Sequence, residues 1–208
     1  RVDDIIYEEF RGTANMELYL LSPSDSDPIH PMIDLQRCGT KKDDMLLDES
    51  HLDLANDVQR LLLKAALLAS DATTDEQTGE AIGDPTEVAL VMIGDRLGVD
   101  ESAYRKQHPR LAELAFDSDR KLMSTVYALH GVPTLLTKGA PDVLLKRAVY
   151  LREKQGIRRM TEEDRTEILE QNQRFSGDGL RVLAFAYREL KESEELTLSG
   201  ECDYIFLG

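Results

Sequence analysis

The stretch LMSTVYALHGVPTLLT, residues 122–137, decides the fold class that this sequence predicts. Leu122–Leu129 and Thr134–Thr137 combine apolar and β-branched residues, which favours strands. The residues between them, His130-Gly131-Val132-Pro133, are typical of a turn. Two strands joined by a short turn pair antiparallel, so the stretch predicts a β-hairpin within an antiparallel sheet.

Further strands and helices are predicted on both sides of this hairpin. Strand-like runs occupy residues 2–10, 16–21, 111–116, 180–187 and 204–207. Helical patterns occupy residues 52–69, 84–97, 100–107, 141–148 and 161–176. The sequence therefore predicts an α/β fold of the α+β type, in which helices flank a mainly antiparallel, twisted sheet.

The helix predicted after Gly83 has the clearest start signal. Asp84 suits the N-cap, Pro85 suits the first helical position, and Glu87 stands where a capping-box acid would. Its core-facing residues are expected to be Val88, Val91, Met92 and Leu97, with Gly98 ending the helix.

Composition and charge limit the possible functions. The chain has 208 residues, of which 41% are hydrophobic, so we expect one domain over residues 1–208, with residues 22–50 as a surface loop. The net charge of −15 argues against a nucleic-acid partner, and a phosphate-bearing ligand would need a local basic pocket. No run approaches ~20 apolar residues, so no direct membrane insertion is expected. The chain begins at Arg1, which favours a piece of a larger protein.

General catalytic motifs are mostly missing from the sequence. There is no P-loop, the two cysteines do not form a metal or disulfide pattern, and the four histidines lack metal-ligand spacing. One segment, Phe116-Asp117-Ser118-Asp119, resembles the Asp-x-Asp motif with which the active site of haloacid-dehalogenase-type phosphatases begins. A magnesium-dependent phosphatase that uses Asp117 and Asp119 is therefore one alternative function. A protein-interaction module that uses residues 22–50 is another.

Four ordered segments are more specific than any of these motifs. They are Gly83–Leu90, Phe116–Ser124, Thr137–Asp142 and Gly179–Tyr187. In this order and at these separations they resemble the nucleotide-binding (N) domain of type II P-type cation-transporting ATPases, the calcium-pump branch in particular. The resemblance implies that residues 1–8 and 201–208 connect toward a phosphorylation domain outside this chain.

The resemblance implies an ATP-binding site without catalytic or metal-binding residues of its own. Phe116 matches the aromatic residue that stacks on adenine, Glu87 the acid that meets the adenine amino group, and Leu183 an apolar wall. Lys121 and Lys138 match two lysines of the pocket. Gly139 allows close backbone approach to a ligand, and Arg181 matches the arginine that reaches the phosphates. The ATP-binding residues implied are thus Glu87, Phe116, Lys121, Lys138, Gly139, Arg181 and Leu183.

Each of these residues also has an ordinary structural explanation. Glu87 could be the acid of a capping box, and Phe116 and Leu183 could be core residues. The two lysines and Arg181 could be solvated charges at the edge of a strand. One departure from the family is Ser118, where some members carry an arginine.

The resemblance also implies how the chain works in its parent protein. It would be the cytoplasmic ATP-binding domain of an integral membrane, ion-translocating ATPase, with calcium as the expected ion. The Asp-Lys-Thr-Gly-Thr phosphorylation sequence and the actuator loop are absent from this chain. We therefore expect it to bind ATP without turnover. Partner domains of the same parent would supply the acceptor aspartate and the site for the Mg²⁺ of Mg-ATP.

Overall fold

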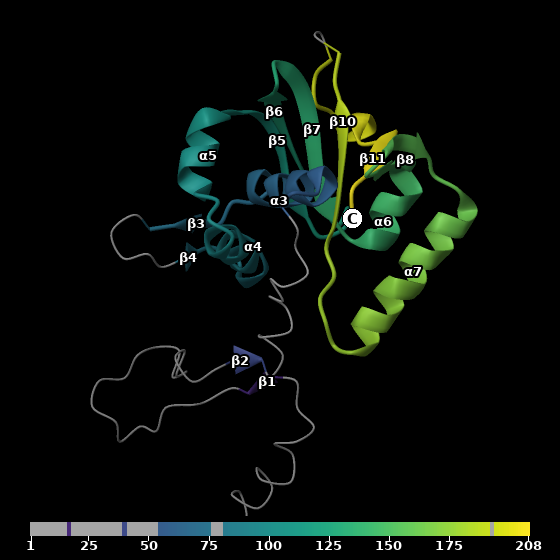
Figure 1. Cartoon of the computed structure of the whole chain (residues 1–208), viewed down its shortest axis with the longest axis horizontal. Coiled ribbons are helices and arrows are strands. Elements are labelled where there is room, and N and C mark those ends of the chain that lie inside the picture. The colour runs from purple at the N-terminus through teal and green to yellow at the C-terminus, as the bar shows by residue number, and fades with distance from the viewer. Residues whose placement is uncertain (1–15, 18–38, 41–53, 76–80, 192–193) are drawn as a thin grey trace, which may run out of the picture. The chain divides into compact units, whose positions relative to one another are not determined.

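The computed structural model describes residues 16–17, 39–40, 54–75, 81–191 and 194–208 (Figure 1). The chain divides into two compact units, Arg1–Asp48 and Glu49–Gly208. In the first unit β1 (Met16–Glu17) pairs antiparallel with β2 (Gly39–Thr40), which lies within the predicted surface loop. The rest of that loop and the strand predicted at residues 2–10 lie outside the described residues.

The second unit is built on a seven-stranded sheet. All neighbouring strands pair antiparallel except β11 and β8, which pair parallel, so the mainly antiparallel sheet is confirmed. In spatial order the strands are β5 (Arg110–Asp117), β6 (Leu122–Leu129), β7 (Val132–Gly139), β10 (Ala184–Glu189), β11 (Tyr204–Phe206), β8 (Ala148–Glu153) and β9 (Gly156–Arg159).

The central hairpin is confirmed, but its turn is tighter than the sequence predicts. Only His130 and Gly131 lie between β6 and β7, and their φ angles are +51° and +83°. Positive φ at both positions gives the turn whose twist matches that of the paired strands. Pro133 therefore lies in β7, where its carbonyl accepts a hydrogen bond from the Leu190 N–H beyond the end of β10 (2.7 Å).

Helices cover both faces of this sheet. Because side chains alternate along a strand, the neighbours Leu135 and Leu136 point to opposite faces. Leu136 packs in a cluster with α3 (Asp57–Leu68), and Leu135 packs in a second cluster with α6 (Pro141–Arg147). In the order of the chain, the other helices are α4 (Pro85–Arg96), α5 (Glu101–Gln107) and α7 (Glu162–Gly177), and a short 3₁₀ turn, η2, spans Leu198–Gly200.

Capping residues set where the helices begin. α3 begins after Asn56, whose side chain accepts from the Val58 N–H (3.0 Å), and not at residue 52 as predicted. α7 begins with a capping box in which Thr161 and Asp164 exchange hydrogen bonds. Val91 is buried in α4 as expected, whereas Met92 is 38% exposed, so its predicted place in the core is wrong.

In the second unit, two pairs of strands were not predicted. β3 (Thr73–Thr74) pairs with β4 (Ala81–Ile82), and β8 pairs with β9 at the far side of the sheet. β8 starts directly after α6 and carries charged residues, so its sequence lacks a clean strand pattern. Among the described residues, no helix is long and apolar enough to cross a membrane.

Gly139 supplies a test of this packing. A Cβ atom on Gly139 would lie 2.2 Å from the Lys121 carbonyl oxygen and 2.5 Å from Leu122 Cδ2. Because the closest atom belongs to the backbone, we predict that Gly139→Ala lowers the free energy of unfolding by about 3 kcal/mol. Urea denaturation measures this change. Gly177→Ala is the control, since Gly177 lies in α7 with open space around it; equal stability of the two variants would contradict the packing described.

Candidate functional site

Four strand ends meet in one row at one end of the sheet. Asp117 at the end of β5 pairs with Leu122 at the start of β6, and Leu122 pairs with Gly139 at the end of β7. Gly139 in turn pairs with Ala184 at the start of β10. Gly139 in this row is one of the residues predicted from the sequence, and others flank the row: Phe116, Lys121, Lys138, Arg181 and Leu183. We call them, together with Glu87, the strand-end site.

Phe116 lies at the edge of this row with most of its surface open. It is 60% exposed, which excludes the alternative of an ordinary core phenylalanine. The register of β5 against β6 is irregular between Leu114 and Asp117, so the strand is bulged where it carries Phe116. An exposed ring held at a strand end is a surface on which a flat apolar group can stack.

The turn between β5 and β6 approaches the end of β7 closely. Lys121 has a φ of +57°, and its carbonyl oxygen accepts a hydrogen bond from the Ala140 N–H (3.2 Å). Only a glycine at position 139 leaves room for that carbonyl. The Lys121 side chain is exposed and has no carboxylate partner among the described residues.

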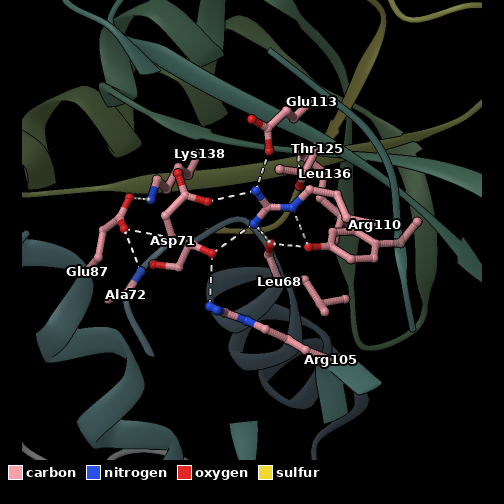
Figure 2. Close-up of polar contacts among 12 residues, drawn as sticks. Leu68, Asp71, Ala72, Glu87, Arg105, Arg110, Glu113, Thr125, Leu136 and Lys138 are labelled. Carbon is pink, nitrogen blue, oxygen red and sulfur yellow. Dashed lines mark hydrogen bonds and ion pairs between the residues drawn. The ribbon is translucent and has the colours of Figure 1, made fainter. Parts of the chain in front are cut away.

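Glu87 and Lys138 form a largely buried ion pair between α4 and β7 (Figure 2). Glu87 Oε1 accepts from Lys138 Nζ, while Glu87 Oε2 accepts from the backbone N–H groups of Asp71 (2.8 Å) and Ala72 (3.0 Å). Glu87 therefore does not act as the capping-box acid that the sequence suggests. Asp84 caps α4 by accepting from the Thr86 N–H (2.9 Å).

Burial changes the electrostatics of this pair. The Lys138 side chain is only 5% exposed, and loss of solvent lowers its pKa below the ordinary value, although the hydrogen bond and charge of Glu87 raise it. Its positive charge is directed at Glu87 rather than at open solvent.

Arg181 and Leu183 come from the segment that enters β10. Arg181 is exposed and its guanidinium donates to Thr86 Oγ1 (3.0 Å), which links this segment to the first turn of α4. The Thr86 N–H, and to a lesser degree the charge of Arg181, lower the pKa of Asp84. Leu183 is partly buried and packs against the cluster that contains α3.

A network that the sequence did not reveal fixes the end of α3 beside Glu87 (Figure 2). Arg110 donates to Asp71 Oδ1 (2.7 Å) and to the Ser70 carbonyl (3.0 Å), and Arg105 donates to the Ser70 carbonyl as well (2.9 Å). Tyr127 donates to the Leu68 carbonyl (2.8 Å). The last carbonyls of a helix need donors from outside it, and guanidinium groups also suit its negative end. No local sequence pattern predicts these contacts, because the donors come from α5, β5 and β6.

The two aspartates of the phosphatase alternative do not form a metal centre. Asp117 Oδ1 accepts from the Arg120 N–H (2.8 Å) and so stabilises its own turn, and both Asp117 and Asp119 are exposed. In the part of the chain that the structure describes, no group of three or more His, Cys, Asp or Glu side chains is placed to hold a metal ion. The structure does not favour this alternative.

Comparisons with known proteins agree with the sequence resemblance. Residues 57–208 match the protein family described as P-type ATPase, cytoplasmic domain N. A calcium-transporting ATPase of Lactococcus lactis is 43% identical over 159 residues, which cover 75% of this chain and 18% of that protein. A calcium-transporting ATPase of Bacillus cereus is 39% identical over 158 residues, 76% of this chain and 18% of the relative. This chain thus spans less than a fifth of the length of these relatives.

The ion pair predicts how Lys138 titrates. Glu87→Gln removes the carboxylate that raises the pKa of Lys138 and leaves the burial that lowers it, so we expect this pKa to fall further below its ordinary value. NMR of the Lys138 side chain as a function of pH measures it. Glu113→Gln is the control, because Glu113 pairs with Arg110 and not with Lys138. An unchanged Lys138 pKa in Glu87→Gln would contradict the ion pair.

Proposed function

The chain belongs to the family of P-type ATPase cytoplasmic N domains, and we propose that it binds ATP at the strand-end site. The observation that carries the proposal is the row of strand ends, which gathers distant segments of the sequence beside one exposed aromatic ring. These segments are the ones in which the sequence resembles nucleotide-binding domains.

Phe116 and Glu87 would hold the adenine. Stacking of a base on an aromatic ring contributes ~1–3 kcal/mol, and Phe116 offers an exposed ring for it. Glu87 already accepts three hydrogen bonds, from Asp71, Ala72 and Lys138. A carboxylate has about four lone-pair positions, so one position is left for the adenine amino group. Leu183 would add an apolar wall, and Gly139, whose Cβ position is filled by the Lys121 carbonyl, would keep the turn between β5 and β6 close to the base.

Lys121 and Arg181 would meet the phosphates. In a chain of net charge −15, phosphates need cations that are not already neutralised. Lys138 is paired with Glu87, whereas Lys121 is exposed. Arg181 is exposed too and donates to the neutral hydroxyl of Thr86, with the Asp84 carboxylate close enough to offset part of its charge. With one stacking ring and few cations, we expect weak affinity, a Kd of about 1 mM.

In its longer parent protein this domain would position Mg-ATP for phosphoryl transfer to an aspartate of a separate phosphorylation domain. Such transfer depends on positioning and on charge stabilisation, and the metal site would come from that other domain. The relatives named as calcium-transporting ATPases support a cytoplasmic domain of a membrane calcium pump. The parent's phosphorylation and actuator domains would then be its partners.

Two substitutions separate the base end from the phosphate end of the site. We predict that Phe116→Ala weakens ATP, ADP and AMP binding alike, by about tenfold, because all three share the adenine. Arg181→Ala should weaken ATP binding more than AMP binding, because its partner is phosphate. Isothermal titration calorimetry measures each affinity.

Matched controls use similar side chains away from the strand-end site. Tyr150→Ala removes a partly exposed ring of β8, and Arg159→Ala removes an exposed arginine of β9. Both variants should bind all three nucleotides as the unsubstituted protein does. Equal losses for ATP and AMP in Arg181→Ala would contradict its phosphate role.

A further inference from the structure

Glu201, just before β11, carries a fully buried carboxylate with three donors. Its side chain is 0% exposed. Glu201 Oε1 accepts from Arg120 and from Ser124 Oγ (2.5 Å), and Oε2 accepts from Arg147 (3.1 Å). A buried carboxylate is costly unless cations and hydrogen bonds compensate it, so the arrangement holds all of these partners in place.

Hydroxyl groups extend this network into the sheet. Ser124 Oγ lies 2.8 Å from Thr137 Oγ1, which donates to the hydroxyl oxygen of Tyr204 (2.8 Å). Burial raises the pKa of Tyr204 to about 12. The carboxylate is therefore anchored to β6, β7 and β11, which are interior strands of the sheet. These contacts hold the Glu201 carboxylate in one position, so that it can in turn hold the side chain of Arg120.

Arg120 connects that carboxylate to the backbone around Phe116. Its guanidinium binds Glu201 and donates to the Ala115 carbonyl (2.5 Å), while its backbone N–H donates to Asp117 Oδ1 (2.8 Å). These contacts reach the residue before Phe116 and the residue after it. Phe116 is 60% exposed, so its ring has little packing of its own to fix its position.

We propose that Glu201, acting through Arg120, positions Phe116 for stacking on the base of a nucleotide. This inference rests on the proposed function and adds two positioning residues to it, neither of which touches the ligand. Without the tether the bulged end of β5 loses the contact that holds the Ala115 carbonyl, and the ring samples more orientations. Binding of the base then weakens because the ring must be ordered at the moment of binding.

Arg147 provides a matched control for Arg120. It binds the same carboxylate as Arg120 but comes from α6, on the far face of the sheet from Glu87, and it also donates to the Glu201 carbonyl (3.4 Å). Arg147→Ala removes one cation from Glu201 and leaves the β5–β6 turn tethered. Arg120→Ala removes one cation and releases the turn.

The test measures AMP affinity by calorimetry in the unsubstituted protein and in four variants: Arg120→Ala, Arg147→Ala, Phe116→Ala and the double variant Phe116→Ala/Arg120→Ala. We expect Arg120→Ala to weaken AMP binding by about fivefold and Arg147→Ala to leave it unchanged. The double variant should bind as Phe116→Ala alone does, because the tether acts through the ring. An additive loss in the double variant, or equal losses in the two arginine variants, overturns the inference.

A second measurement does not depend on nucleotide. Backbone NMR relaxation should show larger motion at Phe116 in Arg120→Ala than in Arg147→Ala, with both spectra still those of a folded protein. Arg120→Lys, which can still reach Glu201, should fall between Arg120→Ala and the unsubstituted protein in this motion. If the unsubstituted protein binds no nucleotide, the proposed function fails. If the relaxation at Phe116 is the same in both arginine variants, the tether itself fails.

Discussion

The buried ion pair between Lys138 and Glu87 joins the helical side of the site to the sheet. Glu87 also accepts the backbone N–H groups of Asp71 and Ala72, so one carboxylate links α4, the segment after α3, and the end of β7. Removal of one partner would leave a charge with little solvent around it, which is strongly destabilising in comparable pairs. The position of the helices over the strand ends depends on this contact, and the shape of the strand-end site depends on that position.

Local signals in the sequence predicted those parts of the fold that local physics determines. The hairpin of β6 and β7, the Asp84 cap of α4 and the Thr161 cap of α7 each depend on residues close together in the chain. The β8–β9 pair was missed because its charged residues obscure the strand pattern. The donors to the end of α3 were missed because Arg110 and Arg105 act across more than 30 residues of sequence.

The candidate site likewise combines features that the sequence indicates with contacts that only the structure shows. Its residues were proposed from the sequence because they match ordered family segments, but the contacts that they make with one another could not be predicted. Gly139 was expected to let a ligand approach the backbone. In the structure the atom that approaches it is the carbonyl oxygen of Lys121, so the absence of a side chain at Gly139 allows the turn between β5 and β6 to pack against β7. Lys138 was expected as a pocket cation, yet its charge is directed at Glu87. Within the strand-end site the exposed cations are Lys121 and Arg181, and this distribution of charge could be read only from the structure.

The most direct test of the central claim is a residue-by-residue NMR titration of the protein with ATP. We predict that backbone amide shifts concentrate at the strand-end site, around Phe116, Lys121, Gly139 and Arg181. The opposite end of the same strands offers a built-in comparison, because a cleft of about 260 Å³ lies there, lined by Tyr104, His108, Leu129 and His130 among others. Saturable shifts centred on that cleft, or no shifts up to tens of millimolar ATP, would contradict the account.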